Sequence, residues 1–230
     1  MTVPAQRIRA LNAAPVRRDG AWVLHWMTAA RRARFNPALE RAAELARELD
    51  RPLVVLEALR IGYPHASDRL HAFVLQGMAD NARRLDGKAT YHPYVERAAG
   101  EGKGLLEALA AKACVVVGDD FPAFFLPRML EAAGKRLGEL GVRLEVVDAS
   151  CIVPFRLAGK DFPTAYAYRR FLQKNLVAWL EHGAMQEHGP AVETIQAYLR
   201  KVNADEAARN PMVEAIRTNA LGAENVLSAA

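Results

Sequence analysis

The fold is decided by residues 19–32, which read DGAWVLHWMTAARR. The apolar run at 22–26 predicts a β-strand, and an arginine-rich turn follows it. A helix is expected to begin in the next residues, because Asn36 is a favoured N-cap and Pro37 suits the first helical position. A strand that leads through a turn directly into a helix is typical of an open parallel sheet. In such sheets the carboxyl ends of the strands face the ligand crevice.

The same alternation of strand and helix continues along the chain. Further strands are expected at 53–59, 88–94, 113–118 and 143–148, and helices at 37–49, 68–85, 105–112 and 126–140. The runs at 53–59 and 113–118 are short and largely apolar, which suits strands buried on both faces of a parallel sheet. This order predicts an α/β fold, a doubly wound five-stranded parallel sheet with right-handed crossovers and a helical C-terminal appendage.

Three segments are expected in this chain of 230 residues, which is long enough to bury a substantial core. An α/β domain occupies residues 1–154 and ends at Pro154. Residues 155–185 form a connecting loop and an aromatic-rich helix at 162–182. Residues 186–230 form an acidic, alanine-rich helical tail, with breaks at Gly189-Pro190 and Asn210-Pro211.

Charge and cysteine content narrow the class of protein. The net charge is +5 and resides in the first 185 residues, because the tail carries four basic against six acidic residues. This balance favours acidic partners such as nucleic acid, although it is also typical of a solvated arginine-rich surface. The chain shows neither a signal peptide nor an apolar run long enough to span a membrane. Cys114 and Cys151 lie in apolar runs, so we expect buried thiols in a reducing cytoplasm.

Several common site motifs are missing from the sequence. The glycine cluster at 100–104 lacks the spacing of a phosphate-binding P-loop and is interpreted as a surface loop. No Gly-x-Gly-x-x-Gly follows the first strand, which argues against ordinary dinucleotide binding. The six histidines show no zinc-ligand spacing, and no nucleophile elbow of a serine hydrolase is present. We therefore assign neither a catalytic residue nor a metal ligand.

Two strand ends carry the candidate binding residues. The turns after the strands at 22–26 and 113–118 are expected to meet at one edge of the sheet, where the strand order reverses. Their aromatic, carboxylate and guanidinium groups suit a flat heteroaromatic ligand with a polar or phosphorylated end. The alternative is that the aromatic side chains belong to the core and the arginines are solvated. The candidate cofactor-binding residues are Trp26, Met27, Arg31, Asn36, Asp120, Phe121 and Arg128.

These motifs, taken in order, resemble the α/β domain of DNA photolyases, above all the class II deoxyribodipyrimidine photolyases. The resemblance begins with the Asp19-Gly20 turn, the strand ending in Trp26-Met27 and the helix start Asn36-x-Ala38-Leu39. It continues through residues 52–56 and 69–78. It then includes Asp119-Asp120-Phe121-Pro122 with Arg128, the exit at 148–154 and the connecting segment at 165–172, so that it covers residues 7–182.

The resemblance implies a Rossmann-like domain that holds an antenna chromophore, a deazaflavin or a folate. Trp26 and Phe121 would form its aromatic walls, Arg31 and Asn36 would bind its polar groups, and Asp120 and Arg128 would complete the edge. In this family of DNA-repair lyases, light energy passes to FAD in a separate helical domain. The FAD then splits a pyrimidine dimer that has been flipped out of DNA.

The FAD domain is not found in these 230 residues, so we do not expect this chain to repair DNA alone. A FAD-binding domain, in trans or in an untruncated chain, is the expected partner. DNA would be contacted only through that domain, and a membrane is not an expected partner. The chain is either truncated or a naturally short form, and its acidic, alanine-rich tail favours the short form.

Two alternatives from other classes remain open at the level of sequence. One is a stand-alone nucleotide-binding module that takes ATP or AMP at the switch point. The other is a protein-interaction module that docks through the helix at 162–182. The apolar stripe of that helix also fits a helix packed on its own sheet. The stripe consists of Phe162, Ala165, Tyr168, Leu172, Leu176 and Trp179.

Overall fold

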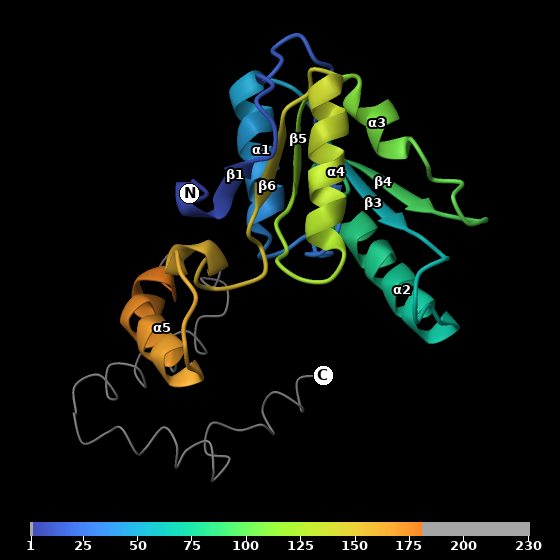
Figure 1. The fold of residues 1–230 in the computed structure, drawn as a ribbon. Coiled ribbons are helices and arrows are strands. Elements are labelled where there is room, and N and C mark those ends of the chain that lie inside the picture. The colour runs from blue at the N-terminus through green and yellow to red at the C-terminus, as the bar shows by residue number, and fades with distance from the viewer. Residues whose placement is uncertain (1, 181–230) are drawn as a thin grey trace. The chain divides into compact units, whose positions relative to one another are not determined.

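The computed structural model describes residues 2–180 and has a six-stranded, mostly parallel sheet with helices on both faces (Figure 1). The strands are β1 (Ile8–Ala10), β2 (Trp22–Met27), β3 (Leu53–Leu59), β4 (Thr90–Val95), β5 (Ala113–Asp119) and β6 (Leu144–Val147). The helices are η1 (Ala5–Arg7), α1 (Pro37–Leu49), α2 (Asp68–Leu85), α3 (Leu105–Ala110), α4 (Leu126–Glu139), η2 (Phe155–Ala158) and α5 (Ala165–Leu180). The predicted α/β class is confirmed.

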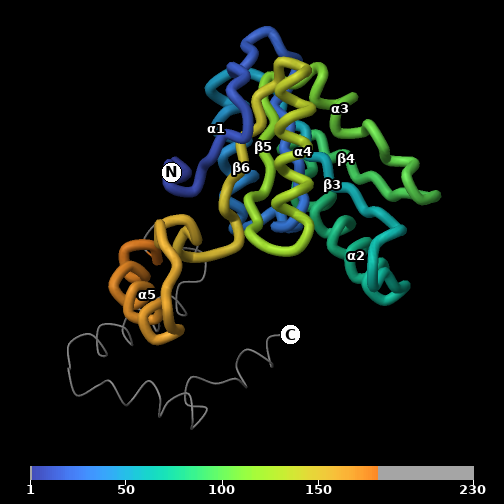
Figure 2. Tube along the Cα trace, in the orientation of Figure 1, coloured from blue at the N-terminus to red at the C-terminus, as the bar shows by residue number. Residues whose placement is uncertain are grey.

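The strand order in the sheet is β1-β6-β5-β2-β3-β4. The five predicted strands are all present and run parallel to one another, whereas β1 is a sixth strand that the sequence did not predict. It pairs antiparallel with β6, with Ile8 opposite Val147. Figure 2 shows this N-terminal segment beside β6. A strand of three residues is too short to show a period of two, so its sequence carries no signal.

Two layers of helix cover the sheet. Side chains of α1 and α2 pack on one face, where Leu45 and Leu85 meet β2 and β3. Side chains of α3 and α4 pack on the other, where Leu130 and Leu137 meet Leu24 and the inner side chains of β5 and β6. Each central strand is therefore covered on both faces and largely apolar, as expected of a parallel sheet.

The predicted starts of α1, α2, α3 and α4 are confirmed. The Asn36 side chain accepts hydrogen bonds from the backbone N–H groups of Ala38 and Leu39, and the Ser67 hydroxyl caps α2. The turn before β2 needs a glycine, because a Cβ at Gly20 would lie 2.5 Å from the backbone nitrogen of Cys114. The Asp-Gly turn therefore lets the chain enter the sheet directly against β5.

Contacts divide the chain into two units, residues 1–159 and 160–230. In the second unit, α5 begins at Ala165 rather than at Phe162. The Phe162 ring instead contacts Tyr168 and Phe171, with ring centroids 5.3 Å apart in each pair. The acidic tail predicted at 186–230 lies outside the described residues, and the packing of the α5 stripe on the sheet stays a prediction.

The two cysteines differ in exposure. Cys114 is buried in β5, as predicted, but Cys151 is exposed. The prediction for Cys151 was wrong because the chain has already left β6 there and forms a loop. Within residues 2–180, no helix has the length and apolar character needed to cross a membrane.

Candidate functional site

The candidate site lies where the strand order reverses. From β2 the chain continues to β3 and β4 on one side, and from β5 it continues to β6 on the other. β2 and β5 are neighbours, with Trp26 opposite Gly118. The turns that leave their carboxyl ends therefore lie at the same edge of the sheet, as the sequence predicted. This is where open α/β sheets bind ligands.

Asp119, at the end of β5, holds the turn that follows β2. Its Oδ2 accepts hydrogen bonds from the backbone N–H groups of Thr28 (2.8 Å), Ala29 (2.8 Å) and Ala30 (3.1 Å). Three successive N–H groups that converge on one oxygen form an anion-binding nest. In this chain the anion is an internal carboxylate, and it ties the turn after β2 to the end of β5.

Asn36 fixes the far end of the same turn. The side chain is buried, and its amide nitrogen donates to the carbonyl oxygens of Ala30 and Arg32, at 3.0 Å each. Its oxygen caps α1, so both ends of the amide are used within the protein. Asn36, a predicted ligand contact, thus helps to shape the turn through these hydrogen bonds.

Arg31 points toward a buried carboxylate of β3. Its Nε lies 3.0 Å from Oε1 of Glu57, whose side chain is 1% exposed. Oε2 of Glu57 accepts from the Asn81 amide (2.9 Å) and the Tyr91 hydroxyl (2.7 Å). Burial and the neighbouring carboxylate raise the pKa of Tyr91 far above its ordinary value, so its hydroxyl remains a donor. Arg31 also donates to the Ala58 carbonyl oxygen at 2.9 Å.

Asp120 and Arg31 pair with different residues. This buried carboxylate binds Arg9 of β1 at 3.2 Å and Arg156 of η2 at 2.9 Å. It therefore joins three segments at the β6 side of the crevice. The structure brings Asp120 together with these two arginines, while Arg31 pairs on the β3 side.

The remaining predicted residues differ in their access to solvent. Met27 is 1% exposed and packs in the core against Val55. Trp26 is half-buried, and its ring carbon Cε3 would lie 3.7 Å from a Cβ added at Gly118. Phe121 is half-buried and stacks on Phe124, with centroids 6.5 Å apart. Arg128, in the first turn of α4, is exposed.

Unusual backbone conformations mark the same edge. Phe35, His65 and Phe124 have positive φ angles of 50°, 67° and 61°. They lie in the loops that leave the carboxyl ends of β2, β3 and β5, in that order. Such conformations are unfavourable for residues other than glycine and cluster at binding sites and switch regions. Phe124 is also 87% exposed.

Sequence reasoning missed the buried polar residues beneath the crevice. His25, Glu57 and Asp119 are each at most 1% exposed and lie in the central strands. The available signal was a histidine and a glutamate inside otherwise apolar strand runs. A polar residue in a strand covered on both faces needs a partner.

Burial gives His25 a pH-dependent effect on stability. Desolvation lowers the pKa of His25 in the folded state, against the opposing influence of Asp119 and Glu57. The unfolded chain then binds the proton more readily, so stability is retained above about pH 6.5 and falls as the pH drops below it. We expect a loss of up to about 1.4 kcal/mol per pH unit, measured by urea unfolding. The His25→Leu variant should lose this slope and a variant of the exposed His92 should keep it; equal slopes in both variants would contradict the assignment.

The amino-acid sequence is similar to that of a known protein over most of its length. It is 30% identical over 175 residues to a deoxyribodipyrimidine photo-lyase of Methanothermobacter thermautotrophicus. The match covers 76% of this chain and 38% of the relative, so the chain spans well under half the length of the protein it resembles. No family model matches the chain. The chain is thus similar in sequence to this photo-lyase, and its α/β fold is Rossmann-like.

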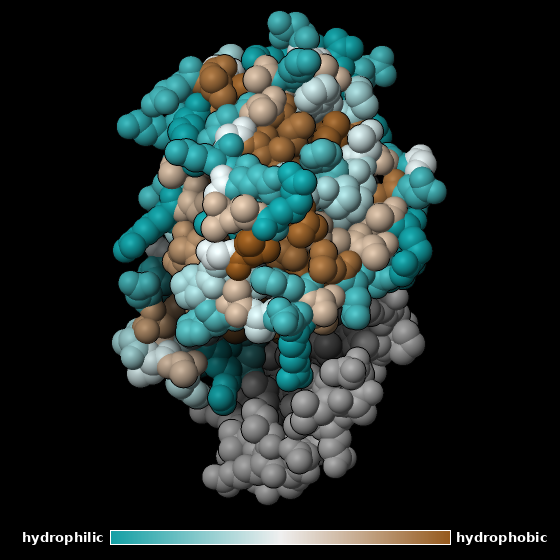
Figure 3. Space-filling model, turned by 90° about the vertical axis from the view of Figure 1, so that its right-hand side faces the viewer, coloured by the Kyte–Doolittle hydropathy of each residue, from teal (hydrophilic) through white to brown (hydrophobic). Residues whose placement is uncertain are grey.

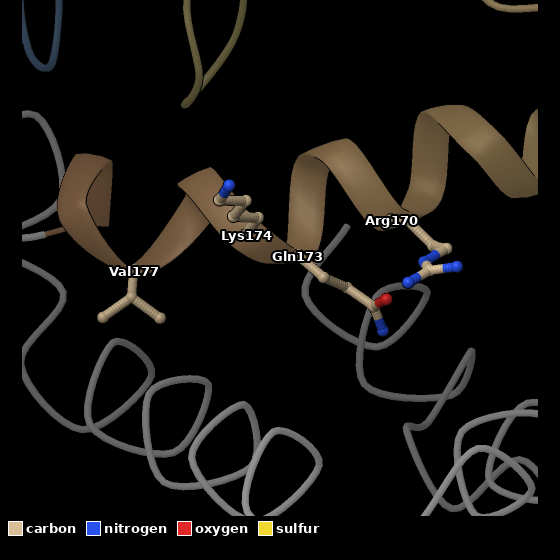
Figure 4. Close-up of a pocket in the computed structure, with 4 residues that line it drawn as sticks. All are labelled: Arg170, Gln173, Lys174 and Val177. Carbon is tan, nitrogen blue, oxygen red and sulfur yellow. The ribbon is translucent and has the colours of Figure 1, made fainter. Parts of the chain in front are cut away.

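Two other surface features are a hollow on α5 and an exposed phenylalanine on α2. On α5, a hollow of about 490 Å³ is lined by Arg170, Gln173, Lys174 and Val177 (Figure 4). It contains none of the predicted binding residues. In residues 1–159, Phe73 of α2 is 75% exposed. Hydrophobic side chains gather in patches on the face of the molecule that Figure 3 shows. Within residues 2–180, no group of three or more His, Cys, Asp or Glu side chains is placed to hold a metal ion.

Proposed function

We propose that this chain is the N-terminal antenna half of a class II-like photolyase and that it binds a deazaflavin or a folate at the switch-point crevice. The observation that carries the proposal is the similarity to a deoxyribodipyrimidine photo-lyase over 76% of the chain. The crevice supports it, because aromatic rings, an exposed guanidinium group and strained loops lie at the edge where this fold takes ligands.

The residues at the edge fit a flat, partly anionic chromophore. Trp26 and Phe121 are half-buried, so part of each ring remains available to stack on a heteroaromatic system. The exposed Arg128 offers a guanidinium group for a carboxylate or phosphate of the ligand. Arg31, Asn36 and Asp120 keep the loops in place through their internal partners. When bound, the chromophore would collect light for a flavin held elsewhere.

The nucleotide-binding alternative is less well supported. Doubly wound domains place a phosphate against the turn after the first strand of the nucleotide-binding unit. In this chain the corresponding N–H groups, at residues 28–30, already donate to Asp119. ATP or AMP bound there would have to displace a buried carboxylate. A ligand that stacks on Trp26 and Phe121 does not need those donors.

The catalytic step belongs to a second component in this proposal. We propose that a FAD-binding domain, in trans or in a longer form of the chain, supplies the flavin and contacts DNA. The relative is much longer than the matched region, which leaves room for such a domain in that protein. The exposed side chains of Leu70, Phe73 and Leu75 on α2 are apolar enough to take part in such an interface.

The proposal is tested by chromophore binding to the full chain. Purified protein is titrated with a deazaflavin and, separately, with a reduced folate, and absorption is recorded between about 350 and 450 nm, the region in which conjugated heteroaromatic systems of this kind absorb. We expect saturable binding of one of them. The Arg128→Ala variant should weaken it at least tenfold, because one well-formed charge-assisted contact contributes about 1.5–3 kcal/mol.

The control is Arg136→Ala, which changes an exposed arginine of the same helix that pairs with Glu107 instead. Eight residues of helix separate the two positions, about 12 Å along the axis. Binding should be unchanged in this control. A protein that takes up neither chromophore would overturn the antenna role, and equal losses in both variants would remove Arg128 from the site.

A further inference from the structure

His25 has a defined protonation pattern in the sheet. The side chain is fully buried, and its Nδ1 lies 3.0 Å from the carbonyl oxygen of Val117. A carbonyl oxygen accepts hydrogen bonds, so Nδ1 carries the hydrogen. Because burial lowers the pKa of His25, the ring is neutral near pH 7. Its other nitrogen, Nε2, then presents a lone pair and acts as an acceptor.

Asp119 presents a second buried acceptor on the same face of the sheet. Its Oδ2 takes all the hydrogen bonds from residues 28–30, while Oδ1 is buried and finds no partner among residues 2–180. Nε2 of His25 is also buried and has no hydrogen-bond partner within residues 2–180. Leaving a buried acceptor without a donor is unfavourable, and buried polar atoms in folded proteins nearly always have a partner.

The strand register brings these two acceptors into one neighbourhood. His25 of β2 lies opposite Val117 of β5, and Asp119 follows two residues later, so its side chain is on the same face. The Asp119 charge also acts directly on the His25 ring. Both atoms are buried acceptors on one face of the sheet without a donor within residues 2–180, and a single group that donates twice would satisfy both. A water molecule is the smallest such group, and buried waters commonly bridge polar atoms in this way.

We propose that His25 and Asp119 enclose a site for a single buried water molecule, which donates one hydrogen bond to Nε2 and one to Oδ1. The water-linked pair orients the Asp119 carboxylate, whose other oxygen holds the crevice turn at residues 28–30. His25 is therefore a positioning residue that acts through Asp119. This assignment does not depend on which ligand the crevice binds.

The first test measures the histidine tautomer by nitrogen NMR of the full chain, labelled on histidine, at about pH 7.5, above the ordinary histidine pKa. The expected result is a neutral ring with hydrogen on Nδ1 and a lone pair on Nε2. A ring protonated on Nε2, or on both nitrogens, would overturn the proposal, because it would donate to Asp119 itself. This measurement needs no substitution and is independent of any effect of mutation on folding.

The second test locates the water and its effect. A high-resolution crystal structure of the full chain should show a water within hydrogen-bonding distance of both atoms; a direct His25–Asp119 contact or a dry site would overturn the proposal. In His25→Leu, the amide hydrogens of residues 28–30 should exchange about tenfold faster. The matched change His71→Leu, in α2, should leave them unchanged. Unchanged exchange in His25→Leu would refute the positioning role.

Discussion

Replacing Glu57 by alanine will lower the free energy of unfolding by about 3–5 kcal/mol. The substitution removes the carboxylate that lies 3.0 Å from Nε of Arg31, and it also strips an acceptor from Asn81 and Tyr91. Glu57 is 1% exposed, so water does not readily replace these contacts. The loss is measured by urea unfolding followed by circular dichroism at neutral pH.

A surface ion pair provides the comparison for Glu57. Asp80 and Arg83 form an exposed pair on α2, and the Asp80→Ala variant should unfold at nearly the same urea concentration as the parent. The free energy of unfolding of the Glu57→Gln variant should lie between those of Glu57→Ala and Asp80→Ala. This variant retains an acceptor but loses the charge that Arg31 needs. Equal stability of Glu57→Ala and Asp80→Ala would show that the buried network contributes little.

Replacing Asp119 by alanine is expected to destabilise the protein by about 2–4 kcal/mol and to loosen the crevice. Three backbone N–H groups, of Thr28, Ala29 and Ala30, lose their shared acceptor, and water can satisfy them only in part. Chemical unfolding measures the stability. Amide exchange of residues 28–30 shows whether the turn opens locally, and the chromophore titration shows whether the site is lost with it.

The Asp119→Asn variant separates the role of the acceptor from that of the charge. It keeps one oxygen for the turn and should lose less stability than Asp119→Ala. If both variants unfold at the parent's urea concentration, the turn is held by other contacts, among them the bonds from Asn36 to Ala30 and Arg32.

Much of the fold was accessible from local sequence signals. The apolar runs predicted five parallel strands, and the Asn36-Pro37 start placed the beginning of α1 correctly. These signals are local, because caps and periodicity depend on residues a few positions apart. The short strand β1 was missed, since it is created by pairing with β6 more than 130 residues later along the chain.

The place where the two turns meet was also predicted, whereas the internal partners of their residues were not. The sequence indicated the carboxyl ends of β2 and β5, and the strand order confirms that these turns are neighbours. The structure places Met27 in the core and gives Asp120 two arginine partners. Ligand contact by the predicted residues stays a prediction that the titration decides.

By itself, the sequence determined an alternating α/β chain and indicated a candidate ligand edge after the strand at 22–26. Tertiary structure alone decided which polar groups support that edge. Glu57 meets Arg31 across 26 positions of sequence, and Asp119 meets Thr28 across 91. Burial makes each of these groups require a partner, and only the folded sheet brings that partner within reach. A histidine or an acid in an apolar run signals that such a partner exists without identifying it.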